Sequence, residues 1–374
     1  MKVITIVGTR PEIIRLSRVI SKLDRFTNHI LVHTGQNYDY ELNKIFFDDL
    51  GLRKPDYFLE AAGETAAATI GNVISKFDEV LAIEKPEALL VLGDTNSSLA
   101  VIPAKRRKIP VFHMEAGNRC YDQRVPEEIN RKIVDHTSDI NMPYSSIARE
   151  YLLREGFPAE QIIKTGSPMY EVLAYYRAAI DSSGVLSRLS LENKKYLVVS
   201  SHREENVDSE NRLRKIADIL HQVCEKYNYP VIFSTHPRTR KRLDAFGIEL
   251  HPLIQTLKPL GFFDYIKLQQ QAFCVISDSG TITEEASILN FPAINLRDAH
   301  ERPEGMEEGV AILTGLSPER VLEAIPVAAS METGEKRSVQ LVKDYFAPDV
   351  SDKVLKIILS YTDYINRRIW KKND

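Results

Sequence analysis

The sequence predicts an α/β protein with two Rossmann-like, doubly wound domains. Short apolar runs rich in β-branched residues alternate with helical patterns along the chain, and polar residues gather directly after many of these runs. Strand, loop, helix, strand is the pattern of a parallel sheet that helices cover on both faces. At 374 residues the chain is too long for one ordinary core and suits two such domains.

Two series of candidate strands support this division. The first half has strands at residues 2–7, 30–33, 88–92, 111–114, 140–142 and 162–164, with helices beginning at Pro11 and near Ser97. The second half has strands at residues 196–200, 231–234, 274–277, 293–296 and 310–313. The break falls between a helix near 169–176 and Lys194, where residues 181–184 suit a loop. We predict domains over residues 1–170 and 171–353, and a terminal helix within 354–374 that packs back on the first domain.

Composition and charge argue against several classes of protein. The net charge of −3 gives no basic field for nucleic acid or an anionic membrane, and the basic residues 105–108 suit the solvated end of a helix. The N-terminal apolar run is too short for a signal peptide, and no segment approaches a membrane span. Cys120, Cys224 and Cys274 form no CxxC pair and suit packing positions in a reduced protein. We expect a cytoplasmic protein that binds neither nucleic acid nor membrane.

Most of the conspicuous polar residues follow strands. In parallel α/β sheets the carboxyl ends of the strands line the ligand crevice. Two such edges facing each other would form a cleft between the domains, and we expect the active site there. The polar segments are residues 8–12, 34–36, 93–96, 113–117, 201–206 and 278–281.

The segment after the strand at 274–277 has the features of a phosphate-binding loop. The small residues Ser279, Gly280 and Thr281 let backbone N–H groups approach a phosphate, and a helix N-terminus favours the anion. Glu285, one turn into the helix, is placed to accept hydrogen bonds from ribose hydroxyls. The alternative is a plain helix cap, with Ser279 or Thr281 as the capping residue. The segment alone favours neither interpretation.

Two further residues are candidates for contact with a diphosphate. Arg10 lies between a Gly-Thr turn and Pro11, where a rigid helix start would let it bind a diphosphate bidentately. The alternative is an arginine at a domain surface. His202 follows a strand and could donate to phosphate or assist a leaving group, whereas a lone histidine is more often structural. His236 has the same position in the next unit and ranks lower.

Three carboxylates are candidates for acid–base chemistry: Asp94, Glu115 and Glu127. Several acids in a half-buried cleft shift one another's pKa, so that one is an acid while another is a base. Glu128 is expected to pair with Arg124 or Arg131 instead. The alternative for the whole set is a network of salt bridges.

Several well-known motifs are missing from the sequence. There is no GxGxxG dinucleotide fingerprint, no GxxxxGK[ST] loop, no HExxH or CxxC metal spacing and no GxSxG elbow. Hydride transfer, ATP hydrolysis and zinc chemistry are therefore disfavoured. A reaction on a phosphorylated ligand without a cofactor or metal is favoured.

Taken together, the motifs resemble those of the non-hydrolysing UDP-N-acetylglucosamine 2-epimerases over nearly the whole chain. That family's fold, two Rossmann-like domains with the nucleotide-sugar in the cleft, is called GT-B, and the family suggests a homodimer. The resemblance rests on VGTRPE at the start, GDTNSSLA at 93–100, HMEAGNR at 113–119, VPEEINR at 125–131, SHREEN at 201–206, SDSGTITEE at 277–285 and ERPEG at 301–305.

Within the family, the chain looks closest to the branch that makes UDP-N-acetyl-L-fucosamine for bacterial capsule and O-antigen. TGQNYDYELN and SHREENVDSE resemble that branch, whose members invert C2 of UDP-2-acetamido-2,6-dideoxy-L-talose. The main branch has lysine where Arg15 stands, so a lysine-specific role is lost. It has histidine and arginine where Asn37 and Asn72 stand. Those two residues belong to an activating UDP-N-acetylglucosamine site, so the resemblance does not extend to that regulation.

The resemblance also implies a mechanism and residue roles. UDP leaves C1 as the C2 proton is removed, giving a 2-acetamidoglycal, and UDP then adds back with a proton on the opposite face of C2. No redox cofactor is needed, and the freed UDP must be held. The implied acid–base residues are Asp94, Glu115 and Glu127. The implied nucleotide ligands are Arg10, Arg15, Ser279, Gly280, Thr281, Glu285 and Arg302, and His202 is implied to act in catalysis at the diphosphate.

Other functions remain open. The nearest in chemistry is interconversion of UDP-N-acetylglucosamine and UDP-N-acetylmannosamine. A glycosyltransferase would share the two-domain fold but leave C2 unchanged. A nucleotide-sugar binding protein with a dead site is disfavoured, because all the acids are present.

Overall fold

The structure is a computed structural model that describes residues 1–35, 40–201, 203–235 and 237–372. The chain divides into two compact units, one of Met1–Ala174 with Asp344–Asp374 and the other of Tyr175–Lys343. The first unit takes up residues 344–353 because they bond to its other segments. Ser167 N donates to the Asp344 carbonyl oxygen at 3.3 Å, and Ser146 N donates to Asp344 Oδ2 at 2.7 Å.

The first unit is built around a six-stranded, all-parallel sheet with the order β3-β2-β1-β4-β5-β6. In register, Val7 at the end of β1 lies opposite His33 at the end of β2. The strand order reverses between β1 and β4, which is the switch point of a doubly wound sheet. The strands are β1 (Lys2–Val7), β2 (Asn28–His33), β3 (Tyr57–Phe58), β4 (Ala88–Leu92), β5 (Val111–Met114) and β6 (Ile140–Met142).

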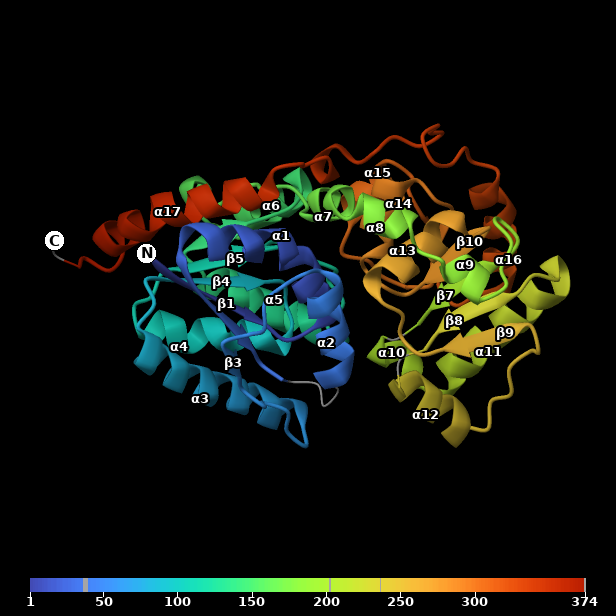
Figure 1. Ribbon diagram of the computed structural model, residues 1–374, viewed down its shortest axis with the longest axis horizontal. Coiled ribbons are helices and arrows are strands. Elements are labelled where there is room, and N and C mark those ends of the chain that lie inside the picture. The colour runs from blue at the N-terminus through green and yellow to red at the C-terminus, as the bar shows by residue number, and fades with distance from the viewer. Residues whose placement is uncertain (36–39, 202, 236, 373–374) are drawn as a thin grey trace. The chain divides into compact units, whose positions relative to one another are not determined.

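Helices cover both faces of this sheet, as Figure 1 shows for α1 on one face and for α3 and α4 on the other. The C-terminal helix α17 packs on α1. Most of these helices are amphipathic; in α1 the buried Ile13, Leu16, Ile20 and Leu23 recur at helical spacing. The helices are α1 (Arg10–Phe26), α2 (Tyr40–Asp49), α3 (Ala66–Glu84), α4 (Val101–Arg106), α5 (Pro126–Thr137), α6 (Ser146–Arg154), α7 (Met169–Tyr175) and α17 (Val350–Arg368), with short 3₁₀ turns η1 (Asn96–Ala100), η2 (Ala159–Gln161) and η3 (Lys343–Tyr345).

The second unit repeats this architecture with the strand order β12-β11-β10-β7-β8-β9, again all parallel. Its switch point lies between β7 and β10. The strands are β7 (Leu197–Ser200), β8 (Val231–Ser234), β9 (Ile254–Leu257), β10 (Cys274–Ser277), β11 (Ala293–Asn295) and β12 (Ile312–Leu313). The helices are α8 (Arg177–Asp181), α9 (Val185–Arg188), α10 (Glu204–Val207), α11 (Glu210–Tyr227), α12 (Pro237–Ala245), α13 (Phe262–Gln271), α14 (Ile282–Leu289), α15 (Pro303–Glu307) and α16 (Pro318–Ala329).

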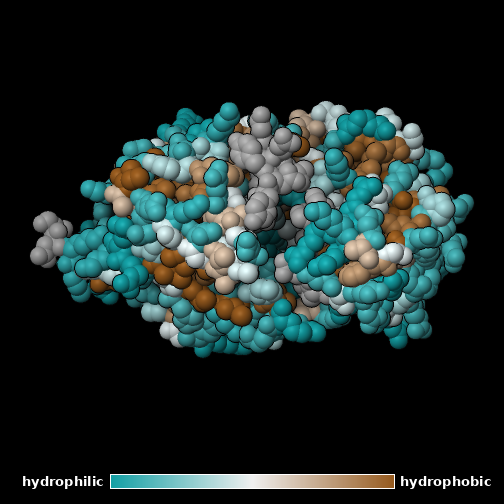
Figure 2. All heavy atoms as spheres, turned by 90° about the horizontal axis from the view of Figure 1, so that it is seen from below, coloured by the Kyte–Doolittle hydropathy of each residue, from teal (hydrophilic) through white to brown (hydrophobic). Residues whose placement is uncertain are grey.

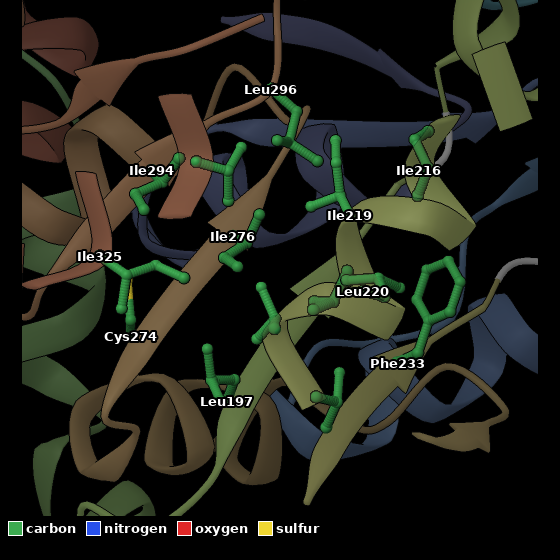
Figure 3. Packing of buried hydrophobic residues seen from close by; sticks show 14 of the residues in the cluster. Leu197, Ile216, Ile219, Leu220, Phe233, Cys274, Ile276, Ile294, Leu296 and Ile325 are labelled. Atoms are coloured by element: carbon green, nitrogen blue, oxygen red, sulfur yellow. The ribbon is translucent and has the colours of Figure 1, made fainter. Parts of the chain in front are cut away.

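The core of the second unit forms where α11 and α16 pack on the sheet (Figure 3). Ile219 and Leu220 of α11 meet strand residues such as Ile276, and Ile325 of α16 lies beside Cys274. Cys274 and Cys224 are both buried and unpaired. The prediction that these two cysteines serve as packing residues is confirmed.

The predicted α/β fold with two doubly wound sheets is confirmed, but three details differ. The predicted strand at residues 162–164 is wrong, because only an isolated bridge joins Ile162 to Asn141. Two edge strands were not predicted. β3 is only two residues long, and β9 has the sequence IQTL, in which the exposed Gln255 and the half-buried Thr256 break the apolar run.

The surface is consistent with the charge-rich composition. Figure 2 shows one face on which hydrophilic residues predominate and smaller hydrophobic areas lie among them. Within the described residues, no helix combines the length and the apolar character needed to cross a bilayer.

Candidate active site

The first polar edge lies at the carboxyl ends of β1, β2 and β4. Thr34 follows β2, Ser97 lies in η1 after β4, and their hydroxyl oxygens are 2.9 Å apart. A Cβ atom on Gly8, which follows β1, would lie 2.0 Å from Ser97 Oγ and 2.2 Å from Thr34 Oγ1. The three connections therefore meet at Gly8 with no space for a side chain.

We expect the substitution Gly8→Ala to destabilise the first unit by about 1–3 kcal/mol, because two packed hydroxyl groups must move. Gly71→Ala is the matched control. Gly71 lies exposed in α3 with nothing within 4 Å of its added Cβ, so alanine should stabilise the helix by about 0.5–1 kcal/mol. Thermal unfolding should show a lower melting temperature than wild type for Gly8→Ala and a higher one for Gly71→Ala. Equal effects would show that space at Gly8 is not limiting.

Glu12, in the first turn of α1, is a buried carboxylate at the same edge. Its Oε2 accepts hydrogen bonds from Gly8 N at 2.8 Å, Thr9 N at 2.7 Å and Thr9 Oγ1 at 2.9 Å. Its Oε1 accepts one from Thr95 Oγ1 at 2.8 Å. Burial raises the pKa of Glu12 to about 7 even though these hydrogen bonds lower it. Our sequence reasoning did not select this residue, although Thr9 and Glu12 have the spacing of a capping box.

The raised pKa of Glu12 predicts a pH-dependent stability. The folded protein takes up a proton near pH 7, whereas the unfolded chain does so near pH 4.5, so wild type gains stability as the pH falls through this window. We expect the gain, relative to Glu12→Gln, to reach about 3 kcal/mol between pH 8 and pH 4.5. Melting temperatures of both proteins across that range provide the test. Parallel curves would contradict the prediction.

Glu115 directly follows β5 and forms an ion pair with Arg15 of α1. Its φ of 65° places a non-glycine residue in the left-handed region, which costs free energy and is found more often at functional sites. Asn118 Nδ2 contacts Glu115 Oε1 at 3.5 Å, and Tyr144 lies 5.9 Å from the Arg15 guanidinium carbon. Arg15 therefore brings a basic side chain to one of the three predicted carboxylates, Glu115.

Asp94 follows β4 and is held by α5. Arg131 Nε donates to Asp94 Oδ2 at 3.0 Å, and Arg131 Nη2 lies 2.8 Å from the same oxygen. Asn130 Nδ2 donates to the Asp94 carbonyl oxygen at 3.0 Å. Arg131 also donates to the fully buried Glu128 at 3.0 Å, which confirms one of the two predicted partners of Glu128. The other, Arg124, pairs with Asp122 instead. Glu127 occupies the first turn of α5.

The buried side chains of His113, Asp135 and Arg119 contact one another next to the ends of β4 and β5. His113 of β5 faces the Gly93 carbonyl oxygen through Nε2 at 2.9 Å and Asp135 Oδ1 through Nδ1 at 3.0 Å. Arg119 donates to Asp135 at 2.8 Å and to Glu155 at 2.7 and 2.6 Å. Burial raises the pKa of Asp135, but the hydrogen bonds and charges of His113 and Arg119 outweigh it and hold that pKa below the usual value.

The second polar edge lies at the carboxyl ends of β7 and β10 in the second unit. Asp278, after β10, accepts hydrogen bonds on Oδ2 from Ser201 Oγ at 2.7 Å, Arg203 N at 3.2 Å and Asn206 Nδ2 at 2.9 Å. This carboxylate therefore joins the connection after β7 to the connection after β10. His202 of that first connection lies outside the described residues, as do His236, Gln36 and Asn37.

The predicted phosphate-binding loop borders three charged residues that sequence reasoning missed. A Cβ atom on Gly280 would lie 3.5 Å from Glu301 Oε2, 3.6 Å from Arg203 Nη2 and 3.9 Å from Arg297 Nη1. Arg297 is buried and forms a two-point ion pair with Glu301, and Arg203 lies 3.4 Å from the same carboxylate. The available signal was position, since Arg203 and Arg297 each come shortly after a strand.

The helix that follows this loop carries the other predicted ligands. Thr281 is the N-cap residue of α14, but its side chain makes no capping hydrogen bond. Ser279 Oγ accepts a hydrogen bond from the backbone Thr281 N at 3.3 Å. Glu285 is buried and accepts from Gln269 Nε2 at 2.7 Å. Arg302 lies 3.0 Å from the fully buried Glu284. Among the residues that the structure describes, no group of three or more His, Cys, Asp or Glu is arranged to hold a metal ion.

Two doubly wound units with a polar edge at each switch point define a GT-B-like α/β protein. The same fold is found in the structure of MurG from Acinetobacter baumannii, with a TM-score of 0.53 and 14% sequence identity over 96% of this chain and 99% of that one. The model of the UDP-N-acetylglucosamine 2-epimerase family matches residues 21–359, and the chain belongs to this family.

Two solved structures and one further relative agree with this assignment. A UDP-N-acetylglucosamine 2-epimerase from Rickettsia bellii is 57% identical, with a TM-score of 0.94 and complete coverage of both chains. The Methanocaldococcus jannaschii enzyme in complex with UDP-GlcNAc and UDP is 34% identical, with a TM-score of 0.90 over 96% of this chain and 100% of that one. A UDP-2,3-diacetamido-2,3-dideoxy-D-glucuronate 2-epimerase from Pseudomonas aeruginosa is 35% identical over 87% of this chain and 91% of the relative.

Proposed function

We propose that the protein inverts C2 of a UDP-N-acetyl amino sugar by eliminating and re-adding UDP. The observation that carries the proposal is the pair of carboxylates at adjacent strand ends, Asp94 after β4 and Glu115 after β5, in a chain of the 2-epimerase family. Relatives named for 2-epimerisation include both N-acetylglucosamine and diacetamidoglucuronate enzymes. The shared reaction is thus better supported than any one sugar.

The reaction needs bases and acids but no net oxidation. The C2–H bond of the sugar is not next to a carbonyl, so its proton leaves together with UDP from C1. The electron pair of the C2–H bond forms the C1–C2 double bond of a 2-acetamidoglycal, and the C1–O electrons leave with UDP. In the return step UDP attacks C1 and a proton is added to the opposite face of C2. Retention of UDP makes this return effectively intramolecular.

The residues of the first edge fit the sugar chemistry. We assign proton transfer at C2 to Asp94, Glu115 and Glu127, because carboxylates in a half-buried site differ in proton affinity according to their neighbours. Arg131 is the neighbour of Asp94 and Arg15 that of Glu115. Arg15 and Arg10 are assigned to the diphosphate, since guanidinium groups bind phosphate oxygens bidentately.

The residues of the second edge fit the nucleotide. We assign Ser279, Gly280 and Thr281 to the phosphates, together with His202, and we assign Glu285 to the ribose. Arg302 is held by Glu284 at the same edge and is assigned to the nucleotide as well.

The substrate that we propose is UDP-2-acetamido-2,6-dideoxy-L-talose, which would give UDP-N-acetyl-L-fucosamine for capsule or O-antigen synthesis. The branch-specific segments support it, as do Arg15 and Asn72. Asn72 Nδ2 contacts the Ala61 carbonyl oxygen at 3.3 Å. The alternative is the exchange of UDP-N-acetylglucosamine and UDP-N-acetylmannosamine. We also propose a cytoplasmic homodimer, which light scattering of the purified protein would test.

Incubation with each UDP-sugar in heavy water tests the reaction and the substrate together. The reactions contain no sugar acceptor. Proton NMR of the anomeric and C2 signals should show inversion of the L-talose derivative and incorporation of deuterium at C2. Turnover of UDP-N-acetylglucosamine alone would refute the branch assignment and keep the family reaction. Sugar transfer without deuterium at C2 would favour a glycosyltransferase.

A further inference from the structure

Glu12 connects two loops to which the proposed function assigns different tasks. Arg10 follows Thr9 in the turn after β1, and Asp94 precedes Thr95 in the loop after β4. Glu12 accepts hydrogen bonds from both Thr9 and Thr95. We propose that Glu12 is a positioning residue that fixes the loop of Asp94 against the turn of Arg10. The inference rests on the proposed function, because that function places diphosphate binding and proton transfer on these two loops.

The direction of the hydrogen bonds is set by the neighbours of Thr95. Its Oγ1 accepts from Ser97 N at 3.2 Å, and its own proton is directed to Glu12 Oε1 at 2.8 Å. On the other oxygen of Glu12, two backbone N–H groups donate. In its ionised form Glu12 accepts from both sides at once, whereas an amide would present an NH₂ group to one of the two sets of donors.

A helix cap alone does not explain this arrangement. The capping box of α1 requires only Thr9 and Glu12. The hydrogen bond from Thr95 comes from a different loop and caps nothing in α1. Burying the carboxylate costs stability, and such costs persist mainly where function requires the geometry.

A double-mutant cycle between Glu12 and Thr95 tests the proposal, with deuterium incorporation at C2 as the readout. We expect Thr95→Val to lower kcat by on the order of 10- to 100-fold with a smaller change in KM, because misplaced catalytic groups slow the chemical step. Thr95→Ser keeps the hydroxyl group and should restore most of kcat. Glu12→Gln should resemble Thr95→Val, and the double variant should be no slower than the worse single one.

The matched control is Asp139→Asn at the opposite end of the same sheet. Asp139 is a buried carboxylate that accepts from Val111 N at 2.9 Å and from Lys105 Nζ at 2.5 Å, at the start of β5. We expect its loss to lower the melting temperature and leave kcat unchanged. The proposal is overturned if kcat of Thr95→Val equals that of wild type, if the two losses simply multiply, or if Asp139→Asn slows turnover equally. A wild-type protein that inverts no UDP-sugar would overturn the proposed function and this inference together, whereas an active wild type with unaffected variants overturns this inference alone.

Discussion

Replacing Asp94 with Asn is expected to lower kcat for C2 inversion by roughly 10²- to 10⁴-fold, the usual contribution of a general acid or base. The amide keeps the size of the side chain and can still contact Arg131, but it neither takes nor gives the C2 proton. The measurement is the rate of deuterium incorporation at C2 by NMR, alongside calorimetry of UDP binding. UDP affinity should change little, because the proposed function assigns Asp94 to the C2 proton and not to the nucleotide.

The control for Asp94 is an exposed aspartate of the same unit. Asp352 of α17 pairs with Lys22 at 2.8 Å on the surface, and Asp352→Asn should leave both turnover and UDP binding intact. An Asp94→Asn protein that incorporates deuterium at the wild-type rate would remove Asp94 from the mechanism. Loss of UDP binding as well would indicate a folding defect rather than a chemical one.

Asp135→Asn should cost about 3–5 kcal/mol of stability, the second large effect that we expect. The carboxylate lies with no exposed surface between His113 and Arg119, whose side chains are also fully buried. Its removal takes the buried anion away from the Arg119 guanidinium, and breaking a buried ion pair on one side is strongly destabilising. Thermal and urea unfolding of the purified variant measure the loss.

An exposed pair gives the contrast for Asp135. Arg107 donates to Asp78 from Nε at 2.5 Å and from Nη2 at 2.8 Å, and solvent screens this pair. Asp78→Asn should therefore change the unfolding profile very little. If Asp135→Asn and Asp78→Asn lost the same stability, the buried contacts of Asp135 with His113 and Arg119 would contribute no more than an exposed ion pair.

Sequence patterns predicted most of the fold because buried parallel strands are continuous apolar runs. The strands at 2–7, 88–92, 111–114, 140–142, 231–234 and 274–277 have the predicted bounds. Two of the four edge strands lack this signal, since β9 contains exposed and half-buried polar residues and β3 is too short for a pattern. β9 and β3 were missed for these reasons. Residues 162–164 were wrongly predicted as a strand because a short apolar segment has the same sequence pattern whether or not it pairs with a sheet.

The site was predictable where residues follow strands and less so where it depends on contacts between loops. Asp94, Glu115 and the loop at Gly280 come directly after strands, so position alone selected them. The pairing of Arg15 with Glu115 spans 100 residues, and the hydrogen bond of Thr95 to Glu12 spans 83. No local pattern encodes such separations, because they arise only when the sheet brings β1, β4 and β5 side by side.

The segment 344–374 gives the first unit its last helix, and this has a consequence for synthesis. A ribosome delivers residues 1–174 first, while the apolar face of α1 still lacks the helix that covers it. The next 169 residues emerge before α17 does. The first unit is thus completed only after the whole second unit has been synthesised, so a truncation that removes residues 344–374 would damage the unit that holds residues 1–174.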